Sequence, residues 1–377
     1  MSRNAFRTTA WAIGKAGNKF EEYFIYRRPV GNNDIHIAIK YAGICHSDIH
    51  QANGEWGTAI YPMIPGHEIA GIVAAVGKNV TKFKVGDHAG IGCMVDSCRN
   101  CSSCANDQEN YCEKGAVLTY NSRMKFSHCP GYSENPEECE PTYGGYSKDI
   151  VCDERFVCLI PKNIPLENAP PLLCAGITVY SPFVYYGVKK GMRIGVAGLG
   201  GLGSMAVKFA KAFGCVVTVF SRGVAKKEEA LNKLGADFYI DSTSTAAAEA
   251  PPENDIIIDT ISANHDLSNY IRTLKVNGKI IILGAPSKPF EINAFDLLMK
   301  RKSICGSLIG GMRETQEMLD FCGTHNLYCD VEICKPNYIN EAYDRTVKGD
   351  VRWRFCIDVN AESDPEDRGL IPIPLPL

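Results

Sequence analysis

The chain has 377 residues, 45% of them hydrophobic, and its 40 Lys and Arg nearly balance 43 Asp and Glu. This length allows two domains with separate cores, and the absence of any basic run excludes a nucleic-acid-binding surface. No apolar run reaches membrane length, which excludes a membrane partner, and no apolar segment follows the first residues, so we expect a cytoplasmic protein.

The chain contains 17 cysteines, a high and odd number. A secreted disulfide framework is a poor explanation for a chain of this length without an export signal. Reduced thiols, some of them bound to metal, fit the composition better.

Residues 8–26 predict short strands, and the alternation over residues 36–41 predicts a half-buried strand that leads to Cys45. His67 follows, and Cys174 lies more than a hundred residues away. Two thiolates and one imidazole suit a zinc ion with an open fourth position. Spacing alone is equally compatible with buried cysteines beside a hydrogen-bonded histidine. Glu68 is interpreted as an outer carboxylate, an alternative ligand or a surface charge.

A denser cysteine pattern follows, with the spacing C-x2-C-x2-C-x7-C at Cys98, Cys101, Cys104 and Cys112. Four thiolates this close together in a polar segment predict a closed tetrahedral zinc site with a structural role. An iron–sulfur cluster is the main alternative, and a lobe without metal is the other.

Residues 191–197 read as a buried strand and residues 204–213 as a helix with one apolar side. Between them lies a G-x-G-x-x-G turn, consisting of Gly198, Leu199, Gly200, Gly201, Leu202 and Gly203. In this setting the glycines allow a tight turn, close approach to a pyrophosphate and close packing of helix on strand. The segment therefore predicts dinucleotide binding.

The next apolar strand, residues 215–220, ends at Ser221 and Arg222, with Lys226 close behind. An enzyme that uses NAD needs an acidic residue near here, yet there is no Asp or Glu between Ser204 and Lys227. The hydroxyl and the cations would instead hold a 2′-phosphate, which predicts NADP(H). The alternative is that the lysines merely begin a solvated helix.

Strand-like and helix-like segments continue to alternate up to about residue 310, which predicts a doubly wound parallel sheet in an α/β fold. A predicted helix at 313–326 and a closing strand at 352–358 have to return to the first domain. We therefore expect a Rossmann NADP-binding domain at 175–310 and a zinc-containing catalytic domain at 1–174 and 311–377.

Several separated motifs occur in one order: residues 43–50, 66–68, the four-cysteine lobe, 171–182, 198–203 and 349–355. Together they resemble the zinc-dependent medium-chain alcohol dehydrogenases, in the branch that is like cinnamyl alcohol dehydrogenase and uses NADP. The resemblance covers about residues 30–360. It implies a mostly β, GroES-like catalytic domain beside the Rossmann domain.

The resemblance also implies that Cys45, His67 and Cys174 meet on the catalytic zinc, with Glu68 adjacent to the ion or exchanging with its bound water. A second zinc belongs to the four-cysteine lobe, which gives two zinc ions per chain.

By the same resemblance, Ser47 bonds the alcohol, His50 releases the proton to solvent with help from Glu55, and Thr178 lies near the nicotinamide. Arg222 departs from the family, which often has serines at these positions, but it reinforces the charge argument for NADP(H).

These implications predict an enzyme that interconverts primary alcohols and aldehydes, whether aromatic, cinnamyl or medium aliphatic, and mainly reduces aldehydes in the cell. A homodimer joined through the nucleotide domains is the expected assembly, and small alcohols and aldehydes are the expected partners. The alternatives are a zinc-independent quinone or enone reductase on the same scaffold and a non-catalytic NADPH-binding protein.

Overall fold

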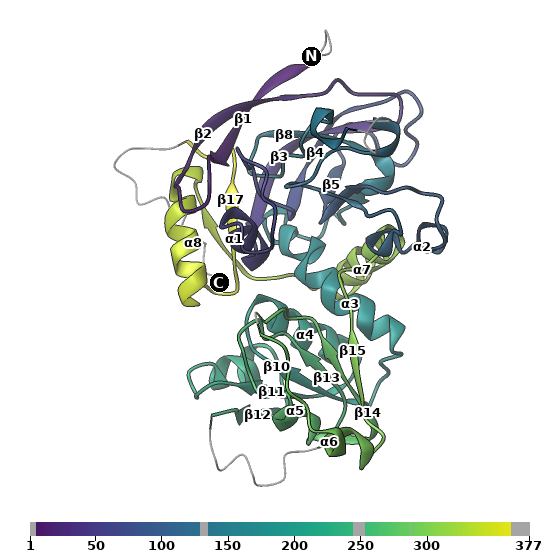
Figure 1. The fold of residues 1–377 in the computed structure, drawn as a ribbon, viewed down its shortest axis with the longest axis vertical. Helices are drawn as coiled ribbons and strands as arrows, with labels where there is room; N and C mark the ends of the chain where they lie inside the picture. Colours follow the sequence, from purple (N-terminus) through teal and green to yellow (C-terminus); the bar gives the residue numbers. More distant parts are fainter. Residues whose placement is uncertain (1–4, 129–134, 244–252, 287, 363–377) are drawn as a thin grey trace. The chain divides into compact units, whose positions relative to one another are not determined.

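The computed structural model describes residues 5–128, 135–243, 253–286 and 288–362 (Figure 1). It divides the chain into two compact units, with Met1–Cys174 and Gly310–Leu377 in unit 1 and Ala175–Ile309 in unit 2. Among the described helices, none is both long enough and apolar enough to cross a membrane.

Unit 1 is built around a seven-stranded, largely antiparallel sheet with the order β16-β17-β3-β4-β5-β9, in which β8 also pairs with β3. The central strand β3 alternates as its sequence predicts: Ile35, Ile37 and Ile39 are buried. The strands of this sheet are β3 (Asp34–Ile44), β4 (Ile69–Val76), β5 (His88–Ile91), β8 (Asp149–Asp153), β9 (Cys158–Leu159), β16 (Val331–Cys334) and β17 (Arg354–Asp358).

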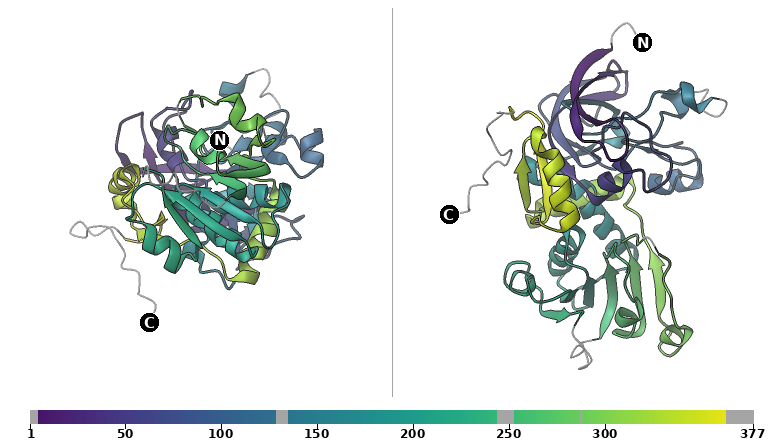
Figure 2. Two further views of the ribbon diagram at one scale, coloured as in Figure 1. Left: turned by 90° about the horizontal axis from the view of Figure 1, so that it is seen from below. Right: turned by 60° about the vertical axis from the view of Figure 1, so that its left-hand side comes forward.

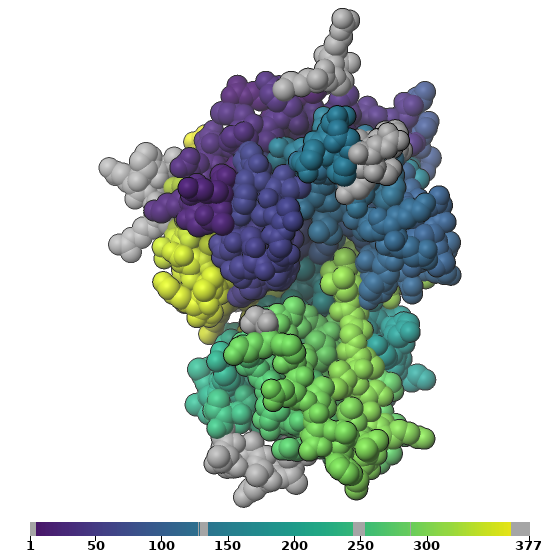
Figure 3. All heavy atoms as spheres, viewed as in Figure 1, coloured from purple at the N-terminus to yellow at the C-terminus, as the bar shows by residue number. Residues whose placement is uncertain are grey.

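Two two-stranded antiparallel sheets, four α-helices and several short 3₁₀ turns complete the described part of unit 1. The C-terminal helix α8, yellow in Figures 1 and 3, lies on the surface of this unit, with Val347 exposed to solvent. The remaining elements are β1 (Phe6–Ile13), β2 (Phe20–Arg27), β6 (Met94–Asp96), β7 (Val117–Leu118), α1 (His46–Ala52), α2 (Ser102–Ala105), α7 (Met312–His325) and α8 (Ile339–Lys348).

Unit 2 contains a six-stranded parallel sheet with the order β12-β11-β10-β13-β14-β15, whose strands are seen side by side in Figure 2 (right). The first strand, β10, lies between β11 and β13, so the order reverses there. Its elements are α3 (Ala175–Tyr185), β10 (Arg193–Ala197), α4 (Gly201–Ala212), β11 (Val216–Ser221), β12 (Phe238–Asp241), β13 (Asn254–Asp259), α5 (Ser268–Ile271), β14 (Leu274–Ile282), α6 (Ala294–Leu298) and β15 (Ser303–Gly306).

Apolar side chains of the strands and of α5 form the core of unit 2, including Phe220, Ile257, Ile271 and Ile280. This doubly wound parallel sheet confirms the predicted fold class. The crevice at the carboxyl ends of β10 and β13, where the strand order reverses, is the usual place for a ligand in such a sheet.

Candidate functional site

Four potential metal ligands meet inside unit 1. One ligand atom from each of Cys45, His67, Glu68 and Cys174 lies within 4.8 Å of all the others, and all four residues are buried. Cys45 directly follows β3 and is the N-cap of α1, His67 and Glu68 immediately precede β4, and Cys174 follows a short 3₁₀ turn. Residues far apart in the sequence are therefore brought together by the ends of neighbouring elements.

Cys45, His67, Glu68 and Cys174 form the cluster that is predicted to be catalytic, which we call the catalytic cluster. The distances within it suit a thiolate and imidazole site. The Sγ atoms of Cys45 and Cys174 are 3.9 Å apart, and His67 Nε2 is 3.3 Å from Cys174 Sγ. In a tetrahedral zinc site the ligands approach the ion to about 2.0–2.3 Å, which requires such short separations between them. The donor set and its burial therefore fit zinc.

Asp48 holds two of these ligands in place. Its Oδ1 lies 3.0 Å from His67 Nδ1, and its Oδ2 accepts a 2.8 Å hydrogen bond from the backbone N–H of Cys45. In the neutral ring, which is the form that binds a metal, Nδ1–H donates to Asp48 and the lone pair of Nε2 faces Cys174 Sγ. Burial opposes the charge on His67, but the Asp48 carboxylate raises the pKa of His67 well above its ordinary value.

Glu68 is fully buried beside the sulfur atoms, so the interpretation as a surface charge is wrong. Its Oε1 lies 3.1 Å from Arg354 Nη2 in an ion pair, yet neither carboxylate oxygen accepts a hydrogen bond from the described residues. Burial raises the pKa of Glu68 to about 8, against the opposing effect of Arg354. A buried carboxylate whose oxygens accept no hydrogen bond beyond this ion pair is further evidence that the cluster fits a cation.

Sequence reasoning did not find Asp48, Arg354 or Cys93. Asp48 had a local signal, because it stands three residues after Cys45, where a side chain can bond back to the helix start. Cys93 shares a side-chain hydrogen bond with Cys174. Arg354 and Cys93 approach the cluster through sheet pairing and loop packing, for which the sequence holds no local pattern.

The two residues expected in the proton path lie on α1. Ser47 Oγ is 3.6 Å from Cys45 Sγ. His50 Nδ1 is 2.6 Å from Glu55 Oε2, and its ring stacks on that of Trp56 with centroids 5.0 Å apart. The His50 side chain is 29% exposed, so it can exchange protons with water.

The four-cysteine lobe forms the second cluster of unit 1, with the sulfur atoms of Cys98, Cys101, Cys104 and Cys112 all within 4.8 Å of one another. Backbone N–H groups donate to two of them, from Cys98 to Cys112 Sγ and from Glu113 to Cys101 Sγ, each at 3.5 Å. Backbone hydrogen bonds from Cys104 and Glu113 lower the pKa of Cys101 to about 6. These features fit the predicted structural zinc.

The cysteines of both clusters are free, in agreement with the expectation of reduced thiols. Cys139 differs, because it is disulfide-bonded.

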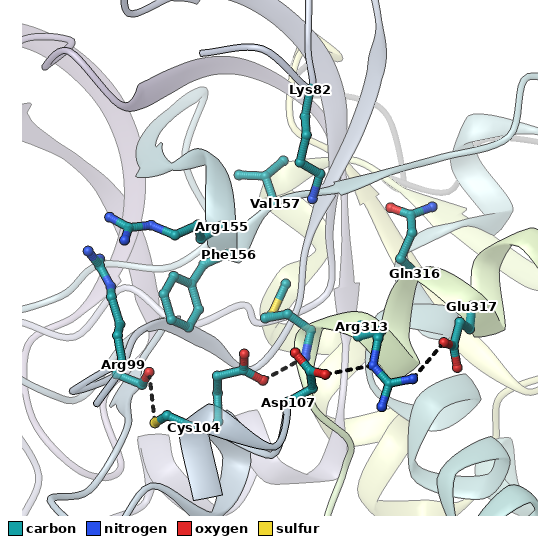
Figure 4. A pocket seen from close by; sticks show the side chains of 13 residues that line it. Lys82, Arg99, Cys104, Asp107, Arg155, Phe156, Val157, Arg313, Gln316 and Glu317 are labelled. Atoms are coloured by element: carbon teal, nitrogen blue, oxygen red, sulfur yellow. Dashed lines mark hydrogen bonds and ion pairs between the residues drawn. The ribbon is translucent and has the colours of Figure 1, made fainter. Parts of the chain in front are cut away.

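A separate cavity of about 550 Å³ lies in unit 1, between the four-cysteine lobe, the segment around Phe156 and α7 (Figure 4). Its charged side chains largely pair with one another or with adjacent carboxylates. Arg313 contacts Asp107 at 2.8 Å and Glu317 at 3.1 Å, and Arg99 contacts Asp96 at 2.6 Å. This mixture of neutralised charges selects no class of ligand, and we assign none to the cavity.

The glycine turn of unit 2 has the geometry that its sequence predicts. Gly198 has φ +86°, and a Cβ there would lie 2.9 Å from Thr260 Oγ1. A Cβ on Gly203 would lie 2.1 Å from the Gly198 carbonyl oxygen, whereas one on Gly200 would meet nothing within 4 Å. Of the three glycines of the G-x-G-x-x-G pattern, Gly198 and Gly203 are tightly packed, and Gly200 leaves its backbone open to a ligand at the start of α4.

Other predicted coenzyme residues also lie in unit 2. Ser221 ends β11, and Lys226 reaches back to the glycine turn, where its Nζ donates a 2.7 Å hydrogen bond to the Leu199 carbonyl. Arg222 is exposed, and Thr178 is buried in α3. The structure therefore brings Lys226 to the glycine turn.

These observations define a class: a two-unit dehydrogenase with a Rossmann-type sheet, a buried thiolate and imidazole metal site and a separate four-cysteine lobe. Residues 31–162 match the alcohol dehydrogenase GroES-like domain, and residues 201–324 match the zinc-binding dehydrogenase family. The chain belongs to the zinc-binding alcohol dehydrogenase family.

Individual members of this family are similar to the chain over nearly its whole length. It is 50% identical to cinnamyl alcohol dehydrogenase 2 of Arabidopsis thaliana over 94% of this chain and 92% of that protein. It is 48% identical to a probable mannitol dehydrogenase of Fragaria ananassa over 94% of this chain and 95% of that protein. A solved cinnamyl alcohol dehydrogenase of Helicobacter pylori in complex with NADP(H) matches with a TM-score of 0.85 and 43% identity, over 94% of this chain and 99% of that one.

Proposed function

We propose that this enzyme interconverts primary alcohols and aldehydes with NADP(H), using a catalytic zinc, and mainly reduces aldehydes in the cell. The observation that carries the proposal is the convergence of Cys45, His67 and Cys174 with a buried Glu68 whose one cationic partner among the described residues is Arg354. The named substrates of the relatives include a cinnamyl alcohol and mannitol. We infer an aromatic, cinnamyl or medium aliphatic aldehyde for this chain.

Cys45, His67 and Cys174 would hold the catalytic zinc, and Glu68 would exchange with water beside it. When bound, zinc polarises the substrate oxygen and NADPH supplies the hydride. Asp48 keeps His67 in the tautomer that binds metal, and Arg354 balances the charge of Glu68. The cysteines at 98, 101, 104 and 112 would hold a second, structural zinc.

The chain's own groups would carry the proton. Ser47 would bond the substrate oxygen, since its hydroxyl lies beside Cys45. His50 would pass the proton to water, because it is partly exposed and is held by Glu55. Thr178 would lie near the nicotinamide.

The coenzyme would bind to unit 2, with its pyrophosphate at the glycine turn and the start of α4. Ser221, Arg222 and Lys226 would receive the 2′-phosphate, and the contact of Lys226 with Leu199 supports this assignment. Guanidinium and ammonium groups favour the phosphate over the plain ribose hydroxyl of NAD.

We also infer a homodimer joined through unit 2. Its sheet ends at β15, an edge strand, and the neighbouring α6 region exposes Phe295, Leu298 and Met299 by 67%, 69% and 76%. An open edge with apolar side chains nearby is suited to pairing with a second copy.

The test is a steady-state screen of benzylic, cinnamyl and short aliphatic aldehydes with NADPH and NADH, on protein with its metal content measured. We expect two zinc ions per chain and faster turnover with NADPH. One zinc with retained enone reduction would instead identify a zinc-independent reductase, and no oxidation of NADPH by a fully loaded sample would identify a non-catalytic protein.

The coenzyme assignment has its own test in Arg222→Asp. A carboxylate repels the 2′-phosphate and can accept from a ribose hydroxyl, so the preference for NADPH over NADH in kcat/KM should fall by at least about tenfold. Lys208→Asp introduces the same charge change on α4 and serves as the control. An unchanged coenzyme ratio in Arg222→Asp would count against the phosphate assignment.

A further inference from the structure

One residue after Arg222, the backbone is held at both of its polar groups by the neighbouring strand. The N–H of Gly223 donates a 2.8 Å hydrogen bond to Asp241 Oδ1. The carbonyl of Gly223 accepts a 2.8 Å hydrogen bond from the Tyr239 hydroxyl. Tyr239 and Asp241 are alternate residues of β12, so both side chains leave the strand on the same face.

The strand also fixes the start of this loop. Ser221 pairs with Asp241 in the parallel register, and the N–H of Ser242 donates to the Ser221 carbonyl at 3.0 Å. Asp241 is itself held, because its Oδ1 also accepts from the Thr243 hydroxyl at 2.7 Å and from the Thr243 N–H at 2.9 Å. These hydrogen bonds lower the pKa of Asp241, so it remains a carboxylate.

Packing does little to fix the same loop. Gly223 has φ +65°, and a Cβ there would meet no heavy atom within 4 Å. The residues on either side of Gly223 are both exposed: Arg222, and Val224 at 69%. The hydrogen bonds from β12 therefore set the path of the backbone that carries Ser221 and Arg222.

We propose that Tyr239 and Asp241 are positioning residues for coenzyme specificity: they hold residues 221–223 in the conformation that receives the 2′-phosphate of NADP(H). The inference rests on the proposed coenzyme and extends it to two residues outside the phosphate contacts. A loop that is ordered before binding does not spend binding energy on becoming ordered. Removing the hydrogen bonds that order residues 221–223 should therefore weaken binding of the 2′-phosphate specifically.

The opposite effect of Asp241 is also physically possible, since a carboxylate near a phosphate repels it. Two substitutions separate the explanations. Asp241→Asn removes the charge and keeps the Oδ1 acceptor for Gly223, whereas Asp241→Ala removes both. If Asp241 positions the loop, only Asp241→Ala weakens phosphate binding. If it repels the phosphate, both variants strengthen it.

The experiment is calorimetric titration of the full chain with 2′,5′-ADP and, separately, with 5′-AMP. The ratio of the two affinities isolates the 2′-phosphate, because loss of general folding affects both ligands. We expect the ratio to fall about fivefold to twentyfold in Asp241→Ala and in Tyr239→Phe, and to change less than about twofold in Asp241→Asn.

Two variants of unit 2 serve as matched controls. Asp237→Asn removes a carboxylate that bonds Lys211 and the N–H of Val217, away from this loop. Tyr185→Phe removes a hydroxyl from a side chain that is 72% exposed. Both should keep the wild-type ratio.

The inference is overturned if Asp241→Ala and Tyr239→Phe leave the affinity ratio unchanged, including the case in which the affinities for both ligands fall equally. It is also overturned if Asp241→Asn prefers 2′,5′-ADP more strongly than the wild type does. A wild-type chain that binds 2′,5′-ADP no more tightly than 5′-AMP would overturn the NADP(H) assignment itself, and the inference with it.

Discussion

The two metal clusters of unit 1 use similar donors in different surroundings. The catalytic cluster takes its ligands from segments up to 129 residues apart, and it is packed around buried charged groups, Asp48, Glu68 and Arg354. The four-cysteine lobe takes all its ligands from one segment, residues 98–112, and backbone N–H groups bond to its sulfur atoms. The arrangement of the catalytic cluster suits a zinc ion with an open coordination position for substrate. The arrangement of the four-cysteine lobe suits a fully coordinated zinc ion that stabilises a loop.

This difference predicts that the catalytic cluster can be broken without unfolding the chain. Cys45→Ser removes one thiolate from a site that the surrounding sheet already holds together. We expect kcat/KM for aldehyde reduction to fall more than about a thousandfold, with a loss of at least about 4 kcal/mol of transition-state stabilisation. Activity assays, circular dichroism and a zinc count test this expectation.

The matched change in the other cluster is Cys101→Ser. A Cys45→Ser protein that unfolds at room temperature, or a Cys101→Ser protein that keeps its full thermal stability, would contradict the division of roles between the two clusters.

Cys101→Ser should act on stability. The lobe contains only α2 and a 3₁₀ turn at Glu109–Tyr111, with the short strands β6 and β7 at its two ends, so it has little core of its own without metal. Loss of a structural metal is one of the few changes that lower the free energy of unfolding by more than about 4 kcal/mol. We expect a decrease of this size in Cys101→Ser, together with one zinc fewer per chain. Denaturant unfolding and metal analysis measure both quantities, and catalytic constants per folded, zinc-loaded site should change little.

The two clusters also differ in how far the sequence predicts them. The spacing of Cys98, Cys101 and Cys104 is local, so the ligand set could be read directly from the residues. The glycine turn was equally local. The meeting of Cys45 with Cys174 depends on long-range packing, and only the resemblance of the chain to a family indicated it.

The groups around the catalytic cluster were the hardest to predict. Arg354 reaches Glu68 because β17 pairs with β3, a pairing between strands separated by most of the chain. The same limit applied to Tyr239 and Asp241, whose contacts with Gly223 follow from the parallel register of β11 and β12. Sequence patterns identify strands, but they do not state which side chains face each other across two of them.

A smaller effect, on metal affinity, is expected from Asp48. This carboxylate holds ligands of the catalytic cluster and has no counterpart beside the four described cysteines of the lobe. Asp48→Asn keeps the shape of the side chain, but its single carbonyl oxygen can replace only one of the two carboxylate oxygens. If that oxygen keeps accepting from the N–H of Cys45, the amide NH2 turns toward the N–H of Gly66 and His67 Nδ1, and His67 loses its acceptor. Groups in this position typically change metal affinity by about tenfold to a hundredfold. We therefore expect the catalytic zinc to be lost at a lower chelator concentration, while the four-cysteine zinc is retained.

The chain offers a matched control for this change in a second Asp and His pair of unit 1. His36 Nε2 lies 2.8 Å from Asp149 Oδ1, and neither residue belongs to a metal cluster. Asp149→Asn should leave the chelator concentration for both zinc ions unchanged. Equal release from both variants, or release of the four-cysteine zinc first in Asp48→Asn, would mean that Asp48 stabilises the unit as a whole. Selective release would mean that Asp48 acts through the two ligands that it holds, His67 and Cys45, because Asp149 makes no such contact with a predicted metal ligand.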